Sequence, residues 1–98
     1  MDFDQKAKYF DTDKRKERAK IIANHIRQYI GDNYLSAMEF GCGTGLIGLE
    51  LINLFSSITF IDSSRGMIEE INQKIANIPN AVAMRWAIST DGTLVPCS

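Results

Sequence analysis

The sequence has little of what marks secreted, membrane-spanning or polyanion-binding proteins. Its 98 residues include two cysteines, Cys42 and Cys97, which do not form a disulfide framework, so we expect a cytoplasmic location. No apolar run approaches the roughly 20 residues that cross a bilayer, and the acidic N-terminus lacks the apolar segment of a signal peptide. A net charge of −1 gives no electrostatic reason to expect a nucleic-acid partner. No cluster of His, Cys, Asp and Glu has metal-ligand spacing, so no metal site is predicted.

What is present is the composition of an ordinary globular domain. The chain is 45% hydrophobic and 23% charged, and its length allows one domain over residues 1–98. Helical periodicity alternates with short apolar runs, which predicts βαβ units and a parallel sheet. The expected fold is therefore α/β, a Rossmann-like three-layer sandwich with an N-terminal helix. Strands are predicted at 35–40, 58–61 and 81–87, helices at 12–30, 46–55 and 65–77, and a loop from 89 to 98.

The N-terminal helix is predicted to begin after a cap at Thr12 or Asp13. Its apolar residues recur at helical spacing and are expected to form the buried stripe. The members of this stripe are Ile22, Ile26, Tyr29 and Ile30.

A glycine-rich loop, Glu39 to Gly45 (EFGCGTG), follows the first predicted strand and leads directly into the next helix. Glycine permits positive φ and lets a ligand approach the main chain without meeting a Cβ. The helix beyond it offers unpaired N–H groups and the positive end of a dipole. Open α/β sheets bind ligands at the carboxyl ends of their strands, where this loop falls. The loop therefore predicts a site for a nucleoside cofactor.

Two carboxylates narrow the class of cofactor. Asp62 ends the second predicted strand, where it can accept hydrogen bonds from ribose hydroxyls or cap the following helix. Glu39 ends the first strand. A carboxylate there suits a cofactor with an amino group and would repel a pyrophosphate. Residues 43–48 also match the dinucleotide fingerprint G-x-G-x-x-G, but two residues too late after the strand. The pattern favours an aminoacyl-type nucleoside and leaves an NAD-dependent oxidoreductase as an alternative.

Residues 37–45 resemble motif I of class I S-adenosylmethionine-dependent methyltransferases. Residues 61–68 are similar to that family's second motif, an acidic residue followed by a serine-started helix with Met67 in its first turn. Residues 3–11 resemble the lead-in of its small-molecule, ubiquinone-biosynthesis-like branch. The resemblance spans residues 3–88. It implies S-adenosylmethionine as the cofactor and a small molecule as the methyl acceptor.

The resemblance also implies roles for individual residues, although it names no catalytic residue. The loop glycines, with Cys42 among them, would surround the methionine part of the cofactor, and Glu39 would orient its amino end. Asp62 would hold the ribose, and the remaining residues would flank the adenine. The implied cofactor-binding set is Glu39, Gly41, Cys42, Gly43, Gly45, Asp62, Ser63, Met67, Ala87 and Ile88. Many relatives have an acidic residue just after the third strand, and this sequence has none there.

Only the first three of the family's seven strands are predicted. We therefore expect a single, truncated domain, the N-terminal cofactor-binding part of a methyltransferase, that does not turn over alone. The first strand would have one unpaired edge, whose free N–H and C=O groups tend to pair with another chain. A homodimer could cover this edge. A non-catalytic cofactor-binding or regulatory fragment is the second functional alternative.

Overall fold

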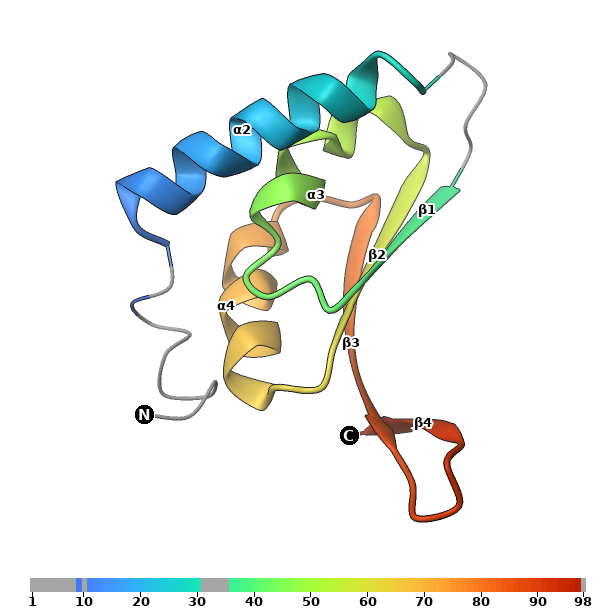
Figure 1. Cartoon of the computed structure of the whole chain (residues 1–98). Coiled ribbons are helices and arrows are strands. Elements are labelled where there is room, and N and C mark those ends of the chain that lie inside the picture. Colours follow the sequence, from blue (N-terminus) through green and yellow to red (C-terminus); the bar gives the residue numbers. More distant parts are fainter. Residues whose placement is uncertain (1–8, 10, 31–35, 98) are drawn as a thin grey trace.

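The computed structural model describes residue 9, residues 11–30 and residues 36–97. Within them, strands form one sheet in the order β1-β2-β3-β4 (Figure 1). The first three strands are parallel, as predicted, and β4 is antiparallel to β3. No helix in these ranges is long and apolar enough to cross a membrane. The elements are α2 (Asp13–Arg27), β1 (Ser36–Phe40), α3 (Leu46–Glu50), η2 (Ile52–Leu54), β2 (Ser57–Asp62), α4 (Arg65–Ile75), β3 (Ala81–Ile88) and β4 (Leu94–Cys97).

Several predictions lie partly outside these ranges. The lead-in segment is described only at residues 9 and 11, and the first predicted strand is described from residue 36 onward. The helix predicted over 46–55 is interrupted: α3 ends at Glu50 and a short 3-10 turn, η2, follows.

Helix α2 begins where the sequence predicts, with the Thr12 side chain as its cap. It ends at Arg27, earlier than expected, and packs mainly against α3 rather than the sheet. Its buried residues are Ala19 and Ala23, whereas Ile22 and Tyr29 are exposed. The predicted stripe is wrong at those two positions, because the small side chains of α2 are the ones that face its neighbouring helix.

The hydrophobic core lies between the sheet and α4, with α3 beside it. Isoleucines at helical spacing on α4 meet alternate side chains of β2, as the two periodicities predict. Ile78, which follows α4, is partly buried and packs against this cluster. The cluster consists of Ile58, Phe60, Ile68, Ile71, Ile75 and Ala81.

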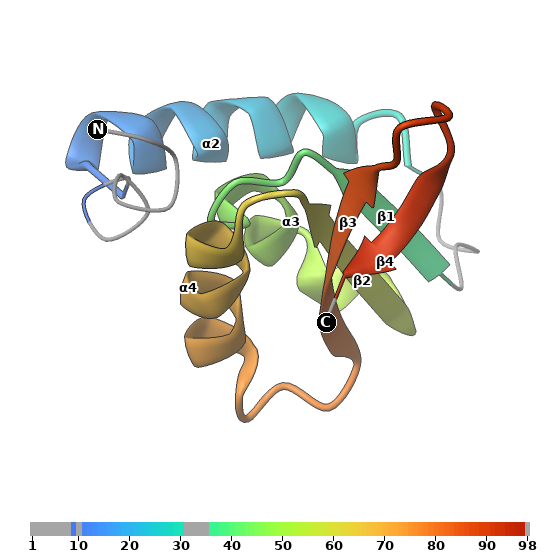
Figure 2. The same cartoon turned by 90° about the horizontal axis from the view of Figure 1, so that it is seen from below.

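The other face of the sheet carries exposed apolar side chains. Met38, Phe40, Val82 and Met84 are exposed, and the parallel register places all four on this face. Helices α3 and α4 lie on the opposite side in both views (Figures 1 and 2). In the described ranges, one helical layer therefore covers one face of the sheet. The second helical layer of a three-layer sandwich is not among the described elements.

Residues 94–97 form strand β4, which corrects the loop predicted for this segment. The strand pairs with the second half of β3, which extends beyond the end of β2. The connecting turn is held by Asp91, which accepts hydrogen bonds from the hydroxyls of Ser89 and Thr93 and from the Thr93 N–H. These bonds, the one from Ser89 foremost, lower the pKa of Asp91 to about 2. A hairpin forms despite weak periodicity because its polar turn and the free edge of β3 supply the pairing.

Candidate functional site

The glycine-rich loop joins the end of β1 to the start of α3. Gly41, Gly43 and Gly45 all have positive φ, at 60°, 58° and 77°. Residues that carry a side chain rarely adopt this backbone conformation. A Cβ on Gly41 would meet no atom within 4 Å, so this part of the loop is open to a ligand. A Cβ on Gly45 would lie 3.2 Å from the Phe60 ring. The backbone conformation therefore requires glycine at both ends of the loop, and close packing adds to the requirement at Gly45.

Asp62, at the end of β2, fastens this loop to the start of α4. One carboxylate oxygen accepts a hydrogen bond from the Gly43 N–H and the other from the Ser64 N–H, both at 2.9 Å. Ser64 is the cap of α4, accepting from the Met67 N–H. A carboxylate offers roughly four acceptor positions, so Asp62 keeps acceptors for further donors such as ribose hydroxyls.

Glu39, at the end of β1, points to the helix-covered side of the sheet beside Gly48 of α3. Its Oε1 is buried and has no hydrogen-bond partner in the part of the chain that the structure describes. Burial raises the pKa of this carboxyl above its ordinary 4.5, and attraction to the nearby Gly48 backbone, which does not reach hydrogen-bond geometry, offsets this in part. A buried acceptor without a donor costs about 1–3 kcal/mol. A ligand that brings a donor to this oxygen would remove that cost.

Cys42 lies in the loop between these two carboxylates. Burial raises the pKa of its thiol to about 12, with further contributions from the negative charges of Asp62 and then Glu39. A raised pKa keeps the thiol in its protonated form, which is a weak nucleophile. The structure thus brings Glu39, Cys42 and Asp62 together, as the sequence predicts.

A pocket of about 240 Å³ lies between the glycine-rich loop and α2. Two arginines on α2, Arg15 and Arg18, line it opposite the loop backbone at residues 41–43. The basic run that contains these arginines, with acidic residues interleaved, predicts a solvated helix face, because helical spacing alone does not say which side of α2 lies over the loop. A basic wall facing open main chain suits a ligand with a carboxylate.

Four further residues of the predicted set lie around the start of α4 and the end of β3. The carbonyl oxygen of Ser63 accepts a hydrogen bond from Arg85 Nε at 2.8 Å. Met67 is only 2% exposed, under the first turn of α4. Ala87 and Ile88 lie where β3 pairs with β4. Their roles toward an adenine stay predictions.

Over the described ranges, no group of three or more His, Cys, Asp or Glu could hold a metal ion.

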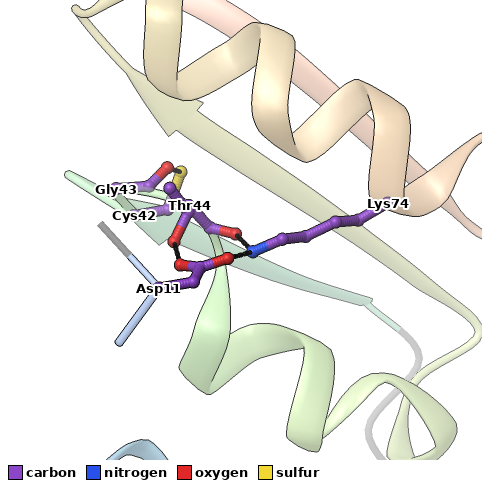
Figure 3. A network of polar contacts seen from close by, with 5 residues as sticks. All are labelled: Asp11, Cys42, Gly43, Thr44 and Lys74. Atoms are coloured by element: carbon purple, nitrogen blue, oxygen red, sulfur yellow. Dashed lines mark hydrogen bonds and ion pairs between the residues drawn. The ribbon is translucent and has the colours of Figure 1, made fainter. Parts of the chain in front are cut away.

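A network of polar contacts around Thr44 of the loop was also not predicted from the sequence (Figure 3). Thr44 is fully buried, and its hydroxyl donates a hydrogen bond to Asp11, just before α2. Lys74, near the end of α4, pairs with Asp11 and donates to the Thr44 carbonyl oxygen at 2.8 Å. Asp11 and Lys74 stand 33 and 30 positions from Thr44, so no local sequence signal points to the network.

Known proteins similar in sequence are methyltransferases, although no protein-family model matches the chain. It is 31% identical over 68 residues to malonyl-[acyl-carrier protein] O-methyltransferase 2 of Ilyobacter polytropus. It is 37% identical over 59 residues to an uncharacterized methyltransferase of Schizosaccharomyces pombe. The matches cover 61% and 58% of this chain but 26% and 21% of those proteins. The chain thus spans about a quarter of the length of these relatives.

Solved structures share the fold at low sequence identity. An S-adenosylmethionine-dependent methyltransferase from Aquifex aeolicus matches with a TM-score of 0.68 and 16% identity, over 90% of this chain and 48% of that one. One from Leishmania major has a TM-score of 0.55 and 21% identity, over 67% and 27%. An amino pentose methyltransferase from Micromonospora echinaspora, solved with S-adenosylmethionine bound, has a TM-score of 0.50 and 18% identity, over 68% and 27%. The chain therefore has the Rossmann-like α/β fold found in these enzymes.

Proposed function

We propose that this chain binds S-adenosylmethionine at its glycine-rich loop and forms the cofactor-binding part of a methyltransferase. The observation that carries the proposal is the buried Glu39 Oε1, an acceptor without a donor beside the loop. An amino group on the ligand would supply that donor and a compensating positive charge. A dinucleotide would instead bring a pyrophosphate toward Glu39, where like charges repel. Glu39 therefore favours S-adenosylmethionine over NAD.

Each part of the cofactor has residues suited to it. The loop from Gly41 to Gly43 would hold the methionine part, with Glu39 at its amino group and the arginines of α2 at its carboxylate. Asp62 would accept from the ribose hydroxyls. Ser63, Met67, Ala87 and Ile88 are the proposed contacts of the adenine.

The cofactor supplies a methyl group activated on a sulfonium. The chain's own contribution is to bind and orient the cofactor and to exclude water from it. The protonated Cys42 thiol fits this role, because no covalent enzyme intermediate is needed.

The acceptor is proposed to be a small molecule. Support comes from the lead-in resemblance and from the net charge of −1, which does not favour a polyanion. Because the chain spans about a quarter of its relatives, we propose that it binds the cofactor without turnover when isolated. A cytoplasmic location stays a prediction. So does a homodimer, which would cover the β1 edge and would show as a doubled mass in gel filtration with light scattering.

Titration calorimetry with S-adenosylhomocysteine and with NADH tests the proposal. We expect saturable binding of S-adenosylhomocysteine and no binding of NADH. Glu39→Gln should weaken the affinity about tenfold, because Gln keeps an acceptor but loses the charge, so a hydrogen bond worth about 1.5–3 kcal/mol becomes one worth about 0.5–1.5 kcal/mol. Glu17→Gln, the same change on the exposed side of α2, is the matched control. Binding of NADH without binding of S-adenosylhomocysteine would refute the proposal and favour an oxidoreductase.

A further inference from the structure

Three segments far apart in the chain meet at Thr44, in the middle of the glycine-rich loop (Figure 3). Asp11 accepts from the Thr44 hydroxyl, and Lys74 both pairs with Asp11 and donates to the Thr44 carbonyl oxygen. We call these three residues the clasp. It holds Thr44 by its side chain and by its main chain at once.

The clasp acts on a stretch of chain that has little rigidity of its own. Thr44 stands between Gly43 and Gly45, and glycine has more backbone freedom to lose than any other residue. The side chains of Asp11 and Lys74 are 22% and 25% exposed, so solvent screens their attraction only in part. Removing either partner leaves the other charge half-buried and releases one tie on the loop.

The clasp also connects the two walls of the pocket. Asp11 directly precedes Thr12, the cap of α2, and the next turns of α2 carry Arg15 and Arg18. The opposite wall is the loop backbone, which continues into Thr44. The bond between Asp11 and Thr44 therefore ties the residue before the α2 cap to the loop.

We propose that Asp11 and Lys74 are positioning residues that hold the start of α2 against the glycine-rich loop and thereby set cofactor affinity. This rests on the proposed function. It differs from the roles of Glu39 and Asp62, because Asp11 and Lys74 act through Thr44 and are not proposed to contact the cofactor. By linkage, a cofactor that binds better with the clasp formed must in turn stabilise the clasp.

The first test is titration calorimetry with S-adenosylhomocysteine on the wild type, Asp11→Asn, Lys74→Met and the double variant. Each single change should weaken binding about tenfold, within the usual range of coupling between sites. The double variant should lose little more, because both changes break the same unit. Lys74→Arg, which keeps the cation and its donors, should restore most of the affinity. Lys20→Met, the same change as Lys74→Met at an exposed position of α2, is the control.

Amide hydrogen exchange supplies a readout that does not depend on affinity. The Lys16 N–H bonds to the Thr12 carbonyl oxygen at 2.9 Å in the first turn of α2. S-adenosylhomocysteine should slow exchange at this amide in the wild type and not in saturated Lys74→Met. Equal protection in both proteins would overturn the inference.

The outcomes separate the two proposals. A wild type that does not bind S-adenosylhomocysteine refutes the proposed function and the clasp with it. A wild type that binds, with Asp11→Asn and Lys74→Met binding equally well, refutes the clasp alone. If circular dichroism shows that Lys74→Met is unfolded, Thr44→Val and Thr44→Ser decide. The valine removes the hydroxyl and should weaken binding, whereas the serine keeps it and should not; equal affinities refute the clasp.

Discussion

Replacing Gly48 by alanine would place one methyl group where α3 touches β2. A Cβ there would lie 2.4 Å from Phe60 Cε1, 3.0 Å from Phe60 Cζ and 2.9 Å from Glu39 Oε1. Non-bonded carbons are at their optimum about 3.5–4.0 Å apart, so the ring or the helix must move by about 1 Å. Phe60 has no exposed surface, and the ring therefore cannot turn toward solvent.

The magnitude follows from two opposing terms. Alanine in a helix interior is favoured over glycine by about 1 kcal/mol. Overpacking a close-packed core typically costs about 1–3 kcal/mol, and this overlap falls at the upper end because the neighbour is an enclosed aromatic ring. We therefore expect Gly48→Ala to lower the free energy of unfolding by about 1–2 kcal/mol. A helix-propensity argument alone predicts the opposite sign.

Urea unfolding followed by circular dichroism measures the change. The midpoint should fall with an unchanged m-value, since both proteins expose the same surface. In a Phe60→Leu background, where the ring is gone, the same glycine change should cost about 1 kcal/mol less. A Gly48→Ala protein as stable as the wild type would refute the reasoning, as would an equal cost in both backgrounds.

Two further predictions concern the ionisable groups beside the loop. The pKa of Glu39 is higher in the folded chain than its ordinary 4.5, so its contribution to stability falls as pH rises from 4.5 through the folded pKa. Glu39→Gln should therefore gain in free energy of unfolding relative to the wild type between pH 4.5 and pH 7; urea titrations that show no gain would contradict this. Cys42, whose thiol pKa is raised to about 12, should resist iodoacetamide at pH 8 in the folded chain and react once urea unfolds it. Mass spectrometry locates the label, and rapid alkylation of folded Cys42 would show that its thiol is not held protonated.

The strand ends and the loop between them were predictable because the signals are local. Apolar alternation and helical spacing locate β1, β2 and α4, and a parallel sheet brings the carboxyl ends of its strands to one edge. Glu39 and Asp62 end two neighbouring strands, so their meeting around the glycine-rich loop follows from the strand assignments alone. The Ser64 cap of α4 is equally local, since its partner N–H belongs to Met67.

Strand β4 could not be predicted from periodicity. Four residues containing Pro96 carry no clear alternation, and the strand exists because β3 has a second edge, opposite β2, with which it can pair. The buried side of α2 was misjudged for a similar reason. Hydrophobicity favoured Ile22, but the packing against α3 selected the smaller Ala19 and Ala23.

Local sequence patterns are enough to predict the α/β class, the parallel order of the first strands, and the loop with its two flanking carboxylates, because each depends on neighbours within a few residues. The surroundings of that loop follow from the packing of the whole domain: the arginines of α2 lie on one side, and Asp11 and Lys74 meet at Thr44. These residues stand 30 or more positions from the loop threonine or lie on a helix whose rotation no spacing specifies. Their meeting depends on how α2 and α4 pack, and packing is set by shape and volume across the whole domain rather than by any local pattern.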